Sequence, residues 1–181
     1  NSETYGGAIN CNNSDLEIRG GNVYNNSSYA GGAIFVDSLS TCSVNGVYFN
    51  NNGANRGGAI ATFRGGRLTV HDSDFYQNSA NGWEENVDPN FPTYAGGGAI
   101  YQEFADTLEI SNTNFSTNSA TAGPGGAMAL YHGTEVLLDS IVIRNNSSTG
   151  GGGGLCLLRP ENVIFNHGVI MDNRSDWNSG G

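Results

Sequence analysis

The chain has 181 residues, which is enough for one domain with a sizeable core, and no abrupt change of composition argues for two domains. It carries 17 acidic against 7 basic residues without a basic cluster, and its formal charge of -10 disfavours nucleic acid as a partner. No apolar run is long enough to span a membrane and the N-terminus lacks the pattern of a signal peptide, so we expect neither within this sequence.

The composition favours many short strands joined by tight turns. Glycine occurs 28 times, asparagine is also abundant, and the apolar residues come in short bursts. Glycine and asparagine are typical of turns, whereas good helix formers are scarce. We therefore expect an all-β fold.

A Gly-Gly-Ala-Ile segment is the first predicted element of an internal repeat. It occurs at Gly6 to Ile9, Gly31 to Ile34, Gly57 to Ile60 and Gly97 to Ile100, and in weaker form at Gly125 to Met128 and Gly153 to Cys156. Gly180 and Gly181 begin a seventh copy. Paired glycines suit a corner where the backbone bends sharply or takes a positive φ.

An apolar-x-apolar pair follows each copy and is the second element. The pairs are Leu16/Ile18, Cys42/Val44, Leu68/Val70, Leu108/Ile110, Val136/Leu138 and Val163/Phe165. This alternation predicts a strand with one buried face.

The third element is an apolar residue followed three positions later by asparagine. It occurs at Val23/Asn26, Phe49/Asn52, Phe75/Asn78, Phe115/Asn118, Ile143/Asn146 and Ile170/Asn173. A stacked asparagine amide can donate to one neighbour and accept from the next, and asparagine tolerates the left-handed backbone of a turn. We expect these six asparagines to form an inward structural column.

A unit of 25 to 28 residues cannot bury its apolar face alone, so the copies must stack. Identical strands stacked in register form a coil of three parallel sheets. The sequence thus predicts a single-stranded parallel β-helix, or solenoid, of about six rungs that spans residues 1–181 as one domain. With strands roughly 4.8 Å apart, the rod is on the order of 29 Å long.

The two elements GGA(I/L) and FxxN, alternating in one short repeat, resemble the repeats of the chlamydial polymorphic membrane proteins and similar bacterial surface β-helices. The clearest copies are Gly57 to Ile60 with Phe75 and Asn78, and Gly97 to Ile100 with Phe115 and Asn118. The resemblance implies a right-handed β-helix that serves as a secreted autotransporter passenger, displayed on the cell surface and used in adhesion.

The largest departure from the repeat is an insertion over residues 79–96, and it is the best candidate for a binding loop. Its candidate residues are Trp83, Glu84, Glu85, Asp88, Phe91 and Tyr94. Aromatic side chains on a projecting loop can stack on sugar rings or anchor a protein partner. Alternatively, these aromatics fold the loop back over the rod.

An acidic cluster could form where Glu103 and Asp106 approach the acids of this loop. Such a cluster could bind calcium weakly or act in a polysaccharide lyase or hydrolase, but a solvated acidic surface is the simpler interpretation. The repeat brings no two acids into adjacent positions of one column. The histidines His71, His132 and His167 fall at three different phases, so we expect no metal site and no cofactor.

Three cysteines, Cys11, Cys42 and Cys156, form neither a disulfide framework nor a metal-ligand pattern. We interpret them as buried small hydrophobes, with one bridge between Cys11 and Cys42 as the alternative. Glycosylation sequons that lie off the inward column are at Asn12, Asn25, Asn114 and Asn145.

The repeated columns predict a β-helix, and none of them indicates a catalytic site. We therefore expect a secreted or cell-surface β-helix that is structural or adhesive and not an enzyme, acting as an adhesin stalk or a filament subunit. Its partners would be a protein or glycan on a host or neighbouring cell, or copies of itself end to end, since neither end offers a cap. Either the chain is an excerpt of a longer solenoid or it is a stacking subunit. A coat protein without a specific ligand is a third hypothesis.

Overall fold

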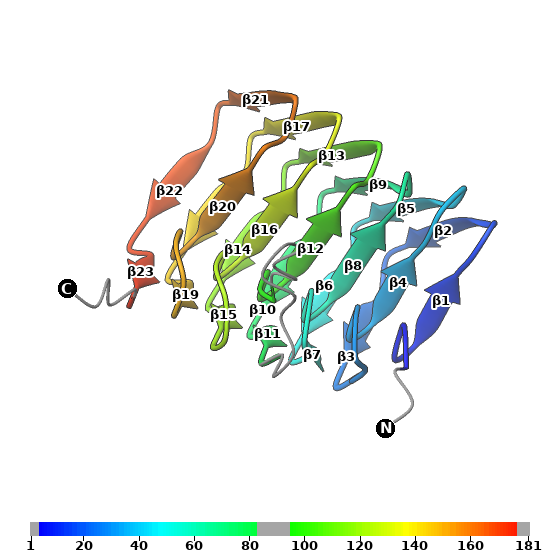
Figure 1. Ribbon diagram of the computed structural model, residues 1–181, viewed down its shortest axis with the longest axis horizontal. Coiled ribbons are helices and arrows are strands. Elements are labelled where there is room, and N and C mark those ends of the chain that lie inside the picture. Colours follow the sequence, from blue (N-terminus) through cyan, green and yellow to red (C-terminus); the bar gives the residue numbers. More distant parts are fainter. Residues whose placement is uncertain (1–3, 83–94, 177–181) are drawn as a thin grey trace, which may run out of the picture.

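The computed structural model describes residues 4–82 and 95–176, and these form an all-β solenoid of parallel strands (Figure 1). The described residues contain no helix. Successive turns of the chain lie side by side along one axis, from β1 in blue to β22 in red (Figure 1). The prediction of a β-helix of about six stacked rungs is confirmed.

The first sheet contains the Gly-Gly-Ala-Ile segments in the order β1-β4-β8-β12-β16-β20. Its strands are β1 (Ile9–Cys11), β4 (Ile34–Val36), β8 (Ile60–Phe63), β12 (Ile100–Glu103), β16 (Met128–Tyr131) and β20 (Leu155–Leu158). The second sheet contains the apolar-x-apolar pairs in β2 (Asp15–Arg19), β5 (Thr41–Asn45), β9 (Arg67–His71), β13 (Thr107–Ser111), β17 (Glu135–Asp139) and β21 (Asn162–Asn166). Both sheets therefore follow directly from the repeat.

The third sheet carries the apolar residue that precedes each column asparagine. Its strands are β3 (Asn22–Tyr24), β6 (Tyr48–Asn50), β10 (Asp74–Tyr76), β14 (Asn114–Ser116), β18 (Val142–Arg144) and β22 (Val169–Met171). A fourth sheet follows the asparagines, with β7 (Gly53–Ala54), β11 (Ser79–Ala80), β15 (Ser119–Ala120), β19 (Ser147–Ser148) and β23 (Arg174–Ser175). The expectation of three sheets was wrong, because strands of two residues are too short to show an alternation in sequence.

Cross-strand pairing corrects the frame of the sixth copy. Leu155 pairs with Met128, so this copy runs from Gly152 to Leu155 and not from Gly153 to Cys156. The run of glycines over 150–154 has no side chains that could fix the frame in the sequence. Leu155 does fix it in the structure, because its side chain continues the buried isoleucine column.

The interior of the solenoid is filled by the predicted apolar columns. Phe49 and Phe75 stack with ring centroids 4.7 Å apart, and Phe75 and Phe115 stack at 4.8 Å. All three rings are fully buried. Offset stacking of this kind adds to the stabilisation that burial of the rings provides.

The six column asparagines form a continuous ladder along the axis. The side chain of Asn78 accepts hydrogen bonds from the backbone N–H and Nδ2 of Asn52, each at 3.0 Å, and donates to the Phe49 carbonyl at 3.1 Å. The same amide-to-amide bond joins each neighbouring pair in the series Asn26, Asn52, Asn78, Asn118, Asn146 and Asn173. The buried amides thereby find their partners within the stack.

The paired glycines allow the rungs to approach closely. Gly57 has a φ of 61°, and a Cβ there would lie 2.1 Å from the Ile60 carbonyl oxygen. A Cβ on Gly58 would lie 2.1 Å from the carbonyl oxygen of Gly98 in the next rung. The first glycine is thus needed for backbone conformation and the second for stacking.

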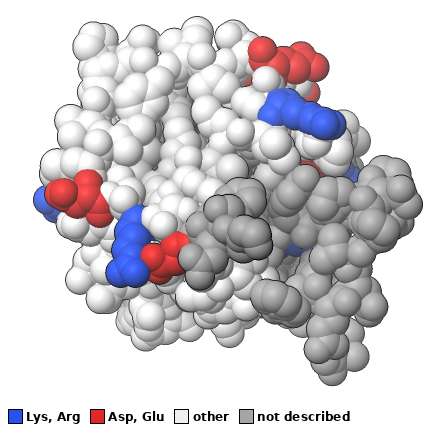
Figure 2. Space-filling model, turned by 60° about the vertical axis from the view of Figure 1, so that its left-hand side comes forward, with Lys and Arg blue, Asp and Glu red and all other residues white. Residues whose placement is uncertain are grey.

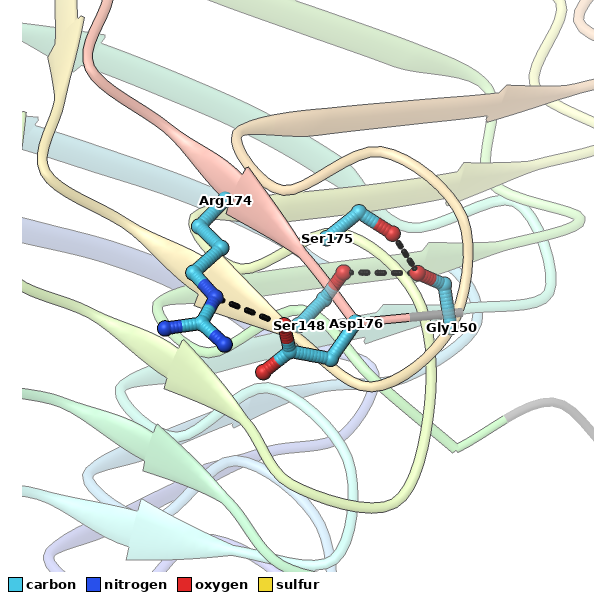
Figure 3. A network of polar contacts seen from close by, with 5 residues as sticks. All are labelled: Ser148, Gly150, Arg174, Ser175 and Asp176. Carbon is cyan, nitrogen blue, oxygen red and sulfur yellow. Dashed lines mark hydrogen bonds and ion pairs between the residues drawn. The ribbon is translucent and has the colours of Figure 1, made fainter. Parts of the chain in front are cut away.

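The last described turn is closed by a small polar network (Figure 3). The carbonyl of Gly150 accepts hydrogen bonds from the hydroxyls of Ser148, at 2.9 Å, and of Ser175. Arg174 Nε donates to Asp176 Oδ1 at 2.6 Å. These contacts hold β23 beside the turn that follows β19.

Candidate functional site

The outer face of the first sheet carries a groove of about 730 Å³. This volume lies within the range of small-ligand sites, roughly 300 to 1,000 Å³. Residues from four successive rungs line it, from Tyr5 in the first to Phe104 in the fourth. Since rungs are roughly 4.8 Å apart, the groove runs along the axis for on the order of 15 Å.

Strand alternation explains which side chains reach this face. Ile34 and Val36 of β4 point into the core, so Phe35 between them points outward. In-register pairing places Ala61 beside Phe35 and Tyr101 beside Ala61. Phe35 and Tyr101 therefore lie in one outward column of the first sheet, with Ala61 between them.

Aromatic rings form a chain across five rungs of this face. The ring centroids of Tyr5 and Phe35 are 4.7 Å apart, and each following step, through Phe63 and Tyr101 to Tyr131, is 5.4 Å. Tyr101 and Tyr131 are almost fully buried although they face outward. Three of these rings, those of Tyr5, Phe35 and Phe63, line the groove.

A carboxylate is held in the fourth rung of the groove. The Tyr101 hydroxyl donates to Glu103 Oε2 at 3.1 Å, and Arg56 Nη1 lies 3.7 Å from the same oxygen. The side chains of Arg56 and Glu103 are only 9% and 17% exposed. Burial, followed by the charge of Glu103, raises the pKa of the Tyr101 phenol well above its ordinary value. Tyr101 therefore stays protonated and remains a donor.

Arg56 joins the charged and aromatic parts of the site. Its guanidinium carbon lies 5.9 Å from the ring centroids of both Tyr29 and Tyr101. A guanidinium at this distance from two rings gains cation–π attraction. These contacts, together with Glu103, position Arg56 in the wall of the groove.

The rim of the groove carries an exposed pair of stacked rings. Phe104 and His132, from neighbouring rungs, lie 4.6 Å apart with an interplanar angle of 9°. Phe104 is 56% exposed and has a φ of 52°. A bulky residue at positive φ is strained, so this exposed ring is held where burial alone would not place it.

A described residue that flanks the insertion, Gly96, lies next to this groove. Ser79 and Ala80 form β11, and Ala95 and Gly96 lie back in the rung beside Arg56, which is bridged to Gly96. Both ends of the insertion predicted over residues 79–96 thus lie in the solenoid, Ser79 and Ala80 in β11 and Gly96 beside Arg56. The six candidate binding residues, Trp83, Glu84, Glu85, Asp88, Phe91 and Tyr94, lie outside the described residues.

The predicted acidic cluster of Glu103 and Asp106 is divided between two arginines. Glu103 faces Arg56 in the groove, whereas Asp106 accepts a hydrogen bond from Arg67 Nη2 at 2.9 Å on the exposed surface. Figure 2 shows a face on which acidic side chains lie beside basic ones, with large uncharged areas between them. Exposed pairs of this kind contribute little stability.

One outer column brings a histidine, a serine and an aspartate together. His71, Ser111 and Asp139 are paired in consecutive rungs, and His71 Nδ1 lies 2.5 Å from Ser111 Oγ. Asp139 contacts His167 at 2.8 Å instead of His71. The serine thus lies between the histidine and the aspartate, whereas a catalytic triad needs the histidine in the middle.

Other candidate ligands are scattered. Within the ranges 4–82 and 95–176, no three His, Cys, Asp or Glu side chains gather closely enough to hold a metal ion.

Cys11, Cys42 and Cys156 are free thiols. The sequon asparagines Asn12, Asn25, Asn114 and Asn145 are exposed, and Asn12 lines the groove. The described part of the chain has no helix that could cross a membrane.

The fold and the groove place the chain in the class of parallel β-solenoids built from short sequence repeats. The family model of the Chlamydia polymorphic membrane protein (Chlamydia_PMP) repeat matches residues 140–157. This segment contains Ile143 and Asn146 of one rung and the glycines that lead to Leu155 in the next, so it includes both repeat elements. The chain thus resembles the chlamydial polymorphic membrane proteins in its repeat. No curated protein and no solved structure matches it.

Sequence reasoning missed the groove itself. Its outward aromatics do not repeat at one phase, because Phe35 and Tyr101 share one column whereas Phe63 and Tyr131 share the next. One signal was available in the sequence: aromatic residues follow the Gly-Gly-Ala-Ile segment by one or three positions in several copies.

Proposed function

We propose that the chain is a surface-displayed, autotransporter-like β-helix that acts as a non-catalytic adhesive module. The repeat match to the Chlamydia polymorphic membrane protein family supports display at a cell surface. The uninterrupted asparagine ladder supports the role of a stiff stalk, because each rung is hydrogen-bonded to the next. Proteins that hold a binding surface away from a cell need such rigidity.

The observation that carries the adhesive role is the groove at the base of the insertion. Exposed Phe104, half-buried Glu103 and buried Arg56 lie together there, and Arg56 is bridged to Gly96 in the next rung. Aromatic and arginine side chains are enriched at binding hot spots. Loops carried on a rigid scaffold commonly supply binding residues.

Cell binding tests this proposal. The fluorescently labelled chain should bind cultured epithelial cells saturably, as measured by flow cytometry, and excess unlabelled chain should compete. A variant that lacks residues 83–94 is the matched comparison, since it keeps the rungs. Binding that is non-saturable, or equal for a scrambled-surface β-solenoid, would contradict an adhesive role.

The rival hypothesis is a polysaccharide lyase or hydrolase. Each described acid near the insertion has an arginine beside it, Arg56 for Glu103 and Arg67 for Asp106, which favours binding over acid–base chemistry. The chain should release no reducing or unsaturated sugar ends from pectin, xylan or hyaluronan. Activity that disappears in Glu103→Gln would establish the enzyme instead.

A further inference from the structure

We propose that the groove on the outer face of the first sheet binds a linear, uncharged glycan that lies along the solenoid axis. This inference rests on the proposed adhesive function and deepens it, because it names the class of ligand at the same site. The argument uses the shape of the groove, its exposed ring, its polar groups and its charge.

The shape of the groove fits an extended chain of repeating units. Successive rungs contribute Asn12, Asp37, Arg64 and Phe104 to the lining, so the groove is elongated along the solenoid axis. The rung spacing of roughly 4.8 Å is comparable with the advance per sugar in an extended polysaccharide. A linear glycan can therefore place one sugar near each rung.

The exposed ring provides a stacking surface for a sugar. The face of an aromatic ring carries negative charge density, which attracts the C–H bonds on the apolar face of a pyranose. Phe104 is 56% exposed at the rim, and its stacking on His132 fixes the plane of its ring. A ring held in place before the ligand arrives loses little conformational freedom on binding.

Side-chain amides and carboxylates suit sugar hydroxyls. The groove is lined by the amides of Asn10 and Asn12 and by the carboxylates of Asp37 and Glu103. An amide both donates and accepts, and a carboxylate accepts, so together they can satisfy hydroxyl groups, which also do both. An apolar peptide segment would leave these groups without partners.

The charge of the site favours an uncharged glycan over an acidic one. The groove is lined by two carboxylates, Asp37 and Glu103, and two guanidinium groups, Arg56 and Arg64, so its lining has no formal net charge. Sulfated or uronic polysaccharides therefore gain no net attraction there, and they approach a chain whose formal charge is -10. Arg56 is already engaged with Glu103 and two tyrosine rings.

Calorimetric titration with defined hexasaccharides tests the inference. The probes are cellohexaose, xylohexaose, mannohexaose and chitohexaose, with a hyaluronan hexasaccharide as the charged comparison. At least one uncharged probe should bind at millimolar concentration or below, and more tightly than the hyaluronan probe. The Phe104→Ala variant should weaken this binding about tenfold, as expected for the loss of one stacked ring.

Matched variants on another face separate the groove from general effects. Asn12→Ala should weaken binding about fivefold, which corresponds to one hydrogen bond. The controls Tyr24→Ala and Asn22→Ala change exposed residues of the same types on β3 and should leave affinity unchanged within about twofold. Circular dichroism should show that all four variants remain folded.

Three results would overturn the inference: no binding of any uncharged probe, tighter binding of hyaluronan, or full affinity in Phe104→Ala. Cell binding distinguishes this failure from failure of the adhesive function. If labelled chain still binds cells after enzymatic removal of their glycans but not after proteolysis, the ligand is a protein, and adhesion stands without the glycan.

Discussion

The side chain of Asn78 donates to Oδ1 of Asn118 at 3.0 Å, although the two residues are 40 positions apart in sequence. Asn52 and Asn78, only 26 positions apart, make the same bond at the same distance. The longer separation contains residues 83–94, yet the geometry of the ladder does not change. The rungs on either side of residues 83–94 therefore stack with the same ladder geometry as the other rungs.

Deletion of residues 83–94 should leave stability almost unchanged. It joins Gly82 to Ala95 and gives this rung the same spacing from its fourth-sheet serine, Ser79, to the glycine pair as the next rung has from Ser119. We expect the free energy of unfolding in urea to change by less than about 1 kcal/mol, since long surface loops have little effect on stability. A loss of several kcal/mol would mean that the insertion is part of the core.

Asn78→Ala should destabilise the chain by about 3 kcal/mol. The substitution removes the acceptor for the backbone N–H and Nδ2 of Asn52 and leaves buried donors without partners. Urea unfolding followed by circular dichroism measures the loss. Asn114→Ala is the control, because Asn114 donates to Asp74 on the exposed surface, has no positive φ and should cost less than about 1 kcal/mol.

Gly58→Ala should prevent normal stacking of the third and fourth rungs. The added Cβ would lie 2.1 Å from the Gly98 carbonyl oxygen and 2.6 Å from the backbone of Ser79, so main chain has to move. We expect a loss above about 4 kcal/mol or no folded protein. Gly65→Ala has open space around its Cβ and a φ of 81°, so it should cost only about 1 to 2 kcal/mol.

Thr117→Gly should stabilise the chain by about 1 kcal/mol. Thr117 is exposed and has a φ of 59°, which is unfavourable for a β-branched residue. Glycine adopts this conformation without steric strain, although it adds some freedom to the unfolded chain. The midpoint of thermal unfolding should rise. Thr149→Gly, at an exposed position without positive φ, should lower it instead.

Buried Cys42 should make the chain sensitive to alkaline pH. Burial, with a smaller contribution from Cys11, raises the pKa of the Cys42 thiol from its ordinary value of 9.0 to about 12. The unfolded chain then ionises first as pH rises. The contribution of the Cys42 thiol to the free energy of unfolding is constant below about pH 9. Between about pH 9 and 12 the free energy of unfolding falls by on the order of 1.4 kcal/mol per pH unit.

The Cys42→Val variant isolates this effect, because valine fits the same buried column. The difference in the free energy of unfolding between the two proteins should widen above about pH 9 in favour of the variant. Cys42 should also resist alkylation at pH 8 in the folded chain. A difference that stays constant from pH 8 to 11 would refute the assignment.

The repeat was readable in the sequence because each rung uses the same residue types at the same places. Phe75 and Phe115 share a column, as do Asn78 and Asn118, and a period shared by several columns admits few folds. Stacking also requires a glycine such as Gly58, which therefore recurs. Fold class, core and ladder positions follow from these patterns alone.

The features that do not follow the sequence repeat, the groove and the fourth sheet, were decided by the tertiary structure. The groove combines Phe35, Phe63 and Phe104, which stand at different phases of their rungs and become neighbours only through pairing and side-chain packing. The two-residue strands of the fourth sheet, such as β11, are likewise defined by their neighbours. A repeated position records the contact that every rung makes, whereas a binding site depends on how one rung differs from the next.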